Sequence, residues 1–158
     1  MANLILWRHA EAQELNDGEL DIDRVLTKRG RKDAANMANW LFQHLPANTE
    51  MICSPAKRCQ QTAKALQKLN KKPLRIADFL SIDTNVAALA QEVLNEHNDK
   101  TLLLIGHQPN LGQLIAHLQG MNEATCIVKK GAVWWLRQKI VDGAQQTYLF
   151  TVQHPDYL

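Results

Sequence analysis

Long hydrophobic runs are missing from this sequence. No uncharged stretch approaches the roughly 18 residues that a bilayer-spanning helix needs. The N-terminus also lacks the basic segment and following apolar stretch of a secretion signal. We therefore expect an unprocessed cytoplasmic protein that does not contact a membrane.

Cysteine is scarce as well, and its pattern excludes two further classes of protein. The three cysteines show no metal-ligand spacing, and an odd number argues against a disulfide framework. They are Cys53, Cys59 and Cys126. A reducing compartment such as the cytosol is the simplest setting for them.

An excess of charge of one sign is also missing. Lysine and arginine number 18 and aspartate and glutamate 16, which gives a formal net charge of +2. So small an excess argues against general nucleic-acid binding, and any basic patch must be local. One local patch is formed by Lys28, Arg29, Arg31 and Lys32, at the start of a predicted helix. We interpret this patch as a solvated helix face, with a docking site for an acidic partner as the alternative.

The length and the remaining composition are those of an ordinary folded protein. The chain has 158 residues, of which 46% are hydrophobic and 22% charged. This is enough chain for one domain with a proper core and too little for two ordinary ones. We expect a single domain over residues 1–158.

Short apolar runs alternate with segments of helical periodicity. The runs lie at residues 4–7, 50–54, 74–77 and 101–106. Thr27 can cap a helix with an apolar stripe, Ser54 and Pro55 can start another, and further helices are expected over 85–97 and from Pro109. The stripe consists of Ala35, Ala38, Leu41, Phe42 and Leu45.

The end of the chain has a different pattern. Two apolar runs at 131–138 and 146–152 flank Asp142 and Gly143, which indicates an antiparallel hairpin. We expect Trp134 and Trp135 to pack on it rather than to bind a ligand. The predicted fold is an α/β three-layer α/β/α sandwich, with a mostly parallel sheet and a C-terminal antiparallel hairpin.

In such a sheet, ligands bind beyond the carboxyl ends of the strands. Arg8 and His9 follow the first apolar run, Ser54 to Arg58 follow the second, and His107 follows the fourth. Each has a structural explanation when taken alone. Two arginines and two histidines at equivalent strand ends, however, converge on one crevice.

That set of side chains suits a tetrahedral dianion. Guanidinium groups present forked donors that match phosphate oxygens, and the first turn of a helix directs free N–H groups at an anion. The sequence has no Walker-type glycine loop and no clear carboxylate cluster for Mg²⁺. We therefore predict phosphate chemistry without a metal or other cofactor, with histidine performing the reaction.

Four motifs in this order resemble the histidine phosphatase superfamily, the phosphoglycerate-mutase-like proteins. They are "RHAEA" after the first strand, "LTKRG" at 26–30, "SPAKRCQQT" at 54–62 and "GHQP" at 106–109. The resemblance covers residues 4–112 and is greatest to the SixA phosphohistidine phosphatase branch. It implies the phosphoglycerate mutase-like fold, with His9 as nucleophile and Arg8, Arg58 and His107 holding the phosphoryl group.

The match is incomplete at the position of the general acid. One branch of the family places an aspartate after the second histidine, where this chain has Gln108, and the mutase branch uses a glutamate earlier. Glu11, Asp78 and Asp83 are weak candidates, and we assign the role to none of them. Ser54 and Gln108 could contact phosphate, or serve as a helix cap and a surface amide. His44, His97, His117 and His154 receive no role.

The missing acid favours cleavage of an N–P bond, because a protonated imidazole leaves more easily than an alkoxide. We predict a phosphohistidine phosphatase that acts through a covalent intermediate on His9. Its partner would be a phosphohistidine-containing signalling or phosphotransfer protein. The alternatives are a small-molecule phosphomonoesterase on the same fold and a catalytically silent phosphate-binding module.

Overall fold

The computed structural model describes residues 2–96, 99–122 and 124–158. Its strands are β1 (Ala2–Arg8), β2 (Glu50–Cys53), β3 (Leu74–Ile76), β4 (Leu102–Gly106), β5 (Val133–Val141) and β6 (Ala144–Gln153). Its helices are α1 (Lys28–His44), α2 (Lys57–Asn70), α3 (Val86–Glu96) and α4 (Asn110–Leu118). Three short 3₁₀ helices are η1 (Asp21–Asp23), η2 (Asp78–Leu80) and η3 (Pro155–Tyr157).

The six strands form one mixed sheet in the order β3-β2-β4-β1-β5-β6. The neighbours among β1 to β4 pair in parallel, whereas β5 runs antiparallel to β1 and β6. The mostly parallel sheet and the C-terminal hairpin are thus confirmed. Since β1 and β4 lie side by side in the middle, the residues that follow them start from adjacent points.

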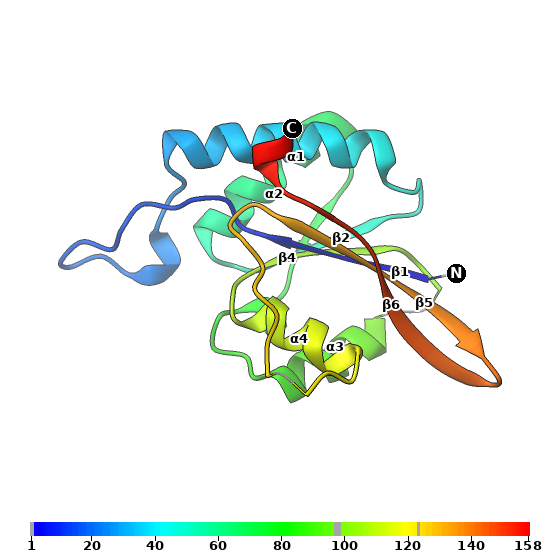
Figure 1. The fold of residues 1–158 in the computed structure, drawn as a ribbon. Coiled ribbons are helices and arrows are strands. Elements are labelled where there is room, and N and C mark those ends of the chain that lie inside the picture. The colour runs from blue at the N-terminus through cyan, green and yellow to red at the C-terminus, as the bar shows by residue number, and fades with distance from the viewer. Residues whose placement is uncertain (1, 97–98, 123) are drawn as a thin grey trace.

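Helices cover both faces of the sheet, and alternate side chains of each strand explain why (Figure 1). Leu4 and Leu6 of β1 belong to the core between the sheet and helices α3 and α4. Ile5 and Trp7 belong to the core between the sheet and helices α1 and α2. A strand buried on both faces reads as a continuous apolar run, as the "LILW" segment does. The predicted three-layer arrangement is therefore confirmed.

The helix starts differ in how well the sequence indicated them. Thr27 caps α1 by accepting a hydrogen bond from the Gly30 N–H at 3.0 Å, as expected. Ser54 does not cap α2, because that helix begins only at Lys57 and Ala56 is its N-cap residue. The apolar stripe of α1 is also rotated from the expected one. Its buried residues are Gly30, Ala34, Met37, Ala38 and Leu41.

The hairpin has the predicted turn. Asp142 and Gly143 have φ values of 51° and 80°, the left-handed pair that a two-residue type I′ turn requires. Trp135 is buried, and its Nε1–H donates to Asn3 Oδ1 at 2.9 Å. Trp134 packs against the core between the sheet and helices α3 and α4. Both tryptophans are packing residues.

The helices of the described residues bear on two further predictions. No helix among them combines the length and the apolar character needed to cross a membrane. The helix predicted over 85–97 is α3, and His97 itself lies outside the described residues.

Candidate active site

The sheet register brings the two histidines together. Arg8, the last residue of β1, pairs with Gly106, the last residue of β4, so His9 and His107 leave adjacent strand ends. The His9 N–H donates to Gly106 O at 3.0 Å. The centroids of the two imidazole rings lie 5.4 Å apart in an edge-on arrangement.

Arg58 of α2 contacts both rings. Its side chain is only 1% exposed. Its Nε–H donates to His9 Nε2 at 3.3 Å, and its NH2 group lies 3.3 Å from His107 Nδ1. Residues that are 49 positions apart along the chain are therefore in direct contact.

The partners of His9 determine its tautomer. Nδ1 lies 2.8 Å from the carbonyl oxygen of Ala10, which can only accept, so Nδ1 carries the proton. Nε2 receives the Arg58 Nε–H, and arginine can only donate, so Nε2 bears a lone pair. An imidazole in this form is a nucleophile at Nε2.

His107 has the opposite tautomer by the same reasoning. Its Nδ1 accepts from Arg58, so its Nε2–H donates to Ser54 Oγ at 2.8 Å. Ser54 is fully buried, and its Oγ also accepts from the Ala56 N–H at 3.2 Å. Ser54 thus orients His107, a role different from the phosphate contact and the helix cap that the sequence suggested for it.

Burial is the main reason why both histidines are neutral. The pKa of His9 is lowered to about 3, mainly by burial and also by the neighbouring His107, Arg58 and Arg8, while the hydrogen bond to Ala10 opposes the shift. Burial also lowers the pKa of His107 to about 4, with the charge of Arg58 as the next cause. For His9, the charges of Arg58 and Arg8 are therefore secondary to desolvation.

Arg8 is placed differently from the other three predicted residues. Its NH1 group donates to Val128 O at 3.0 Å, and its Nε is buried without a hydrogen-bond partner in the described part of the chain. It lines a hollow with Glu11, separate from the one that Arg58 and His107 line. Its charge acts on His9, but the structure brings only His9, Arg58 and His107 into direct contact.

Sequence reasoning missed Asp21, which belongs to η1. Its carbonyl oxygen accepts from Arg58 NH1 at 2.8 Å, and its Oδ2 accepts from Arg58 NH2 at 3.0 Å. Partial burial alone raises the pKa of Asp21, but hydrogen bonds from Arg24 and Arg58 hold it below its usual range. Asp21 is one of several acidic residues between positions 11 and 23, and nothing in the sequence distinguishes it.

A hollow of about 390 Å³ opens beside Arg58 and His107. Its walls include Asp21 and Ile22 of η1 and the residues from Ser81 to Asp83. Of the three acid candidates, Asp83 is thus at the hollow, whereas Glu11 accepts from the Thr27 hydroxyl at 2.8 Å. Asp78 lies in η2.

Two residues of the motifs brace the site rather than line it. Gln108 Nε2 donates to Cys126 O, and its Oε1 accepts from the Gly112 N–H at 3.0 Å, so this amide holds a loop in place. Thr62 is buried, donates to Arg58 O at 2.8 Å and accepts from the Ala10 N–H at 3.1 Å. Thr62 thereby links α2 to the segment that carries His9.

Among the described residues, the thiols and the carboxylates do not assemble a metal-binding group. Over residues 2–96, 99–122 and 124–158, no group of three or more His, Cys, Asp or Glu side chains is arranged to hold a metal ion. Cys53 and Cys59 are both buried. Burial raises the pKa of the Cys59 thiol, which neighbours His107, to about 12.

Comparison with known proteins agrees with this geometry. Residues 4–81 match the family model of the histidine phosphatase superfamily (branch 1). The chain belongs to this superfamily. Members of the histidine phosphatase superfamily similar to this chain are hydrolases.

Individual relatives cover most of the chain. A phosphohistidine phosphatase SixA homolog of Haemophilus influenzae is 27% identical over 75% of this chain and 77% of its own length. The structure of the protein histidine phosphatase SixA complexed with tungstate has a TM-score of 0.76 at 23% identity, over 98% of each chain. A phosphoserine phosphatase of Entamoeba histolytica has a TM-score of 0.76 at 17% identity, over 100% of each chain. The two structures establish the phosphoglycerate mutase-like fold.

Proposed function

We propose that this protein is a phosphohistidine phosphatase that uses His9 as its nucleophile. The observation that carries this proposal is the orientation of the His9 ring. Its Nδ1–H is bound to Ala10 O, and its unprotonated Nε2 faces the Arg58 guanidinium. A neutral imidazole held beside a cationic group suits attack on a phosphoryl group.

In the first step, the lone pair of Nε2 forms an N–P bond while the bond from phosphorus to the leaving nitrogen breaks. The leaving imidazole takes the electron pair of that bond. The His9 ring becomes cationic as the N–P bond forms, and the Ala10 carbonyl that receives its Nδ1–H stabilises this charge. Water then cleaves the new N–P bond, which releases phosphate and restores the neutral ring.

The arginines and His107 would hold the phosphoryl oxygens. Arg58 presents its Nε and NH2 groups to the two imidazoles. The guanidinium can instead donate to phosphate oxygens while the backbone of α2 stays in place. Arg8 Nε is a buried donor with no partner among the described residues and would serve a further oxygen. A dianion beside His107 would also favour its protonated form, which can donate from Nδ1.

Two observations bear on the substrate. The position after His107 holds Gln108, whose side chain is engaged by Cys126 and Gly112 and cannot protonate an alkoxide. This supports a phosphohistidine substrate, for which an acid matters less. Asp21 and Asp83 line the hollow, however, and favour the second candidate function, hydrolysis of small phosphate monoesters. A silent binding module would have no need of a prepared nucleophile such as His9.

The decisive experiment is to trap the phosphoenzyme during turnover of a ³²P-labelled phosphohistidine protein. We expect a label that is lost in acid and survives base, and that is absent from His9→Asn. The exposed His117→Gln is the matched control and should be labelled like the parent. A label that survives acid would contradict the proposal, as would unchanged turnover by His9→Asn.

A comparison of substrates distinguishes the two candidate functions. The favoured one predicts a higher kcat/KM for the phosphohistidine protein than for simple phosphate esters. Rapid ester turnover without action on the protein would establish the second candidate instead. Because the proposed chemistry uses side chains alone, we also expect activity to survive extensive treatment with a chelator.

A further inference from the structure

We infer that the groove between α1 and α2 is a docking surface for an acidic amphipathic helix of the phosphorylated substrate protein. This inference rests on the proposed function, because it names the partner that would deliver the phosphohistidine. The groove has a volume of about 500 Å³ and lies outside the catalytic hollow.

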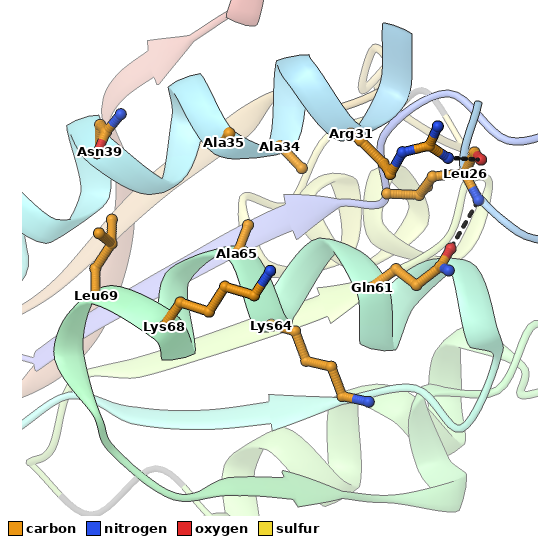
Figure 2. Close-up of a pocket in the computed structure, with 10 residues that line it drawn as sticks. All are labelled: Leu26, Arg31, Ala34, Ala35, Asn39, Gln61, Lys64, Ala65, Lys68 and Leu69. Carbon is orange, nitrogen blue, oxygen red and sulfur yellow. Dashed lines mark hydrogen bonds between the residues drawn. The ribbon is translucent and has the colours of Figure 1, made fainter. Parts of the chain in front are cut away.

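Small side chains where the two helices face each other create the groove. Ala34 and Ala35 of α1 face Ala65 of α2, with Leu26 and Leu69 at the two ends (Figure 2). Alanine leaves space that a larger side chain would fill, so an apolar surface stays open between the helices. A partner helix can therefore approach this floor closely with its own apolar face.

The rim of the groove is cationic. Lys64 and Lys68 lie along its α2 side and Arg31 lies on its α1 side, and none of the described residues that line it is acidic. Both lysines are exposed, and neither forms an ion pair within the part of the chain that the structure describes. Arg31 NH1 is held in place by donating to Leu26 O at 2.9 Å.

Positive charge is concentrated on these two helices. Together α1 and α2 hold eight of the chain's 18 lysine and arginine residues but one of its 16 acidic residues, Asp33. The rest of the chain is therefore net acidic. Because the overall charge is only +2, this concentration of positive charge on α1 and α2 favours an acidic partner at these helices.

The groove is continuous with the catalytic hollow. A middle hollow of about 290 Å³ shares Gln61 and Lys64 with the groove, and shares Ile22 and Pro55 with the hollow beside Arg58. The path follows α2, and the 12 steps from Lys57 to Leu69 span about 18 Å at a rise of 1.5 Å per residue. A helix of similar length that starts near a phosphohistidine would reach the end of the groove.

An acidic protein helix suits this path better than nucleic acid does. The floor is apolar and would bury apolar side chains of the partner, while the lysines would meet its carboxylates. Asp23 lines the middle hollow and would repel a continuous line of phosphates. The separate lysines at the groove itself need only spaced acidic residues.

The first test measures binding of a synthetic peptide, a helix with alanine and leucine on one face and glutamate on the other. We expect salt-sensitive binding to the parent that weakens by roughly tenfold or more in the double variant Lys64→Glu/Lys68→Glu. Ala35→Trp, which fills the groove from an exposed position without a change of charge, should also weaken binding. The control Lys100→Glu/Lys139→Glu makes the same change of charge at the end of the sheet opposite the catalytic hollow, near the N-terminal ends of β1 and β4. It should bind like the parent.

The second test uses phosphohistidine peptides with and without the acidic helix attached. In the parent, the attached helix should lower KM by roughly tenfold without changing kcat. Lys64→Glu/Lys68→Glu should abolish this decrease in KM and leave hydrolysis of the peptide without the helix unchanged. If neither peptide is hydrolysed, the proposed function fails, and the binding test still decides on the docking surface.

Three results would overturn the inference. The first is equal binding of the acidic helix to the parent and to both groove variants. The second is equal binding of a matched peptide with lysine in place of glutamate. The third is tighter binding of single-stranded nucleic acid or of vesicles with anionic lipids through the same two lysines.

Discussion

His9 and His107 should make the stability of the folded protein depend on pH. Burial is the largest cause that lowers their pKa values, to about 3 and about 4. In the unfolded chain a histidine titrates at about 6.5. Between these values the unfolded state binds more protons than the folded state, so the free energy of unfolding falls as the pH falls from about 6.5 towards 4.

The magnitude follows from the same two residues. Between pH 7 and pH 5, protonation of one histidine in the unfolded chain lowers the free energy of that state by about 1.9 kcal/mol. Both rings are buried and stay neutral at pH 5, so the two together remove about 4 kcal/mol of stability. That is a large part of the roughly 5–15 kcal/mol by which a domain is stable.

Urea unfolding followed by tryptophan fluorescence at pH 7, 6 and 5 would measure this loss. His107→Gln should halve the loss between pH 7 and pH 5, because one of the two buried rings is gone. The control His117→Gln removes an exposed histidine and should retain the full loss. Equal losses in the parent and in His107→Gln would refute the reasoning.

Three further predictions concern single contacts. Arg58→Ala should reduce kcat/KM on a phosphohistidine protein by the equivalent of roughly 3 to 5 kcal/mol, with the fold checked by circular dichroism. Thr62→Val should lower the free energy of unfolding in urea by about 1–3 kcal/mol, because the buried Ala10 N–H loses its acceptor, whereas Thr62→Ser should not. Gly30→Ala should lower the melting temperature, because its Cβ would lie 2.0 Å from Glu11 O, at a cost of about 1–3 kcal/mol or more.

The fold could be predicted because the sequence pattern and the chain geometry agree. An apolar run such as 4–7 is buried on both faces, and alternate residues of it divide between the two cores. Once β1 and β4 are parallel neighbours, the residue after each strand must lie near the other. The contact between His9 and His107 is a consequence of that register.

Other features of the site depend on contacts that no local pattern encodes. Ser54 precedes a proline and resembles a helix cap, but its hydroxyl accepts from His107 because α2 begins three residues later. Asp21 reaches Arg58 from a 3₁₀ turn in an acidic loop. Gln108 directly follows His107, yet its side-chain amide donates to the carbonyl oxygen of Cys126. Each contact joins segments whose relative position is set by tertiary packing.

Helix α2 serves both parts of the molecule that we connect with function. Arg58 and Thr62 are four residues apart and lie on its buried face, while Lys64 and Lys68 are four residues apart and lie on its exposed face. At 100° per residue, Lys64 is rotated about 120° away from Arg58. The lysines can therefore be reversed in charge while Arg58 keeps its contacts with both histidines. A loss of docking in the charge-reversed protein would thus report on the groove and not on the site.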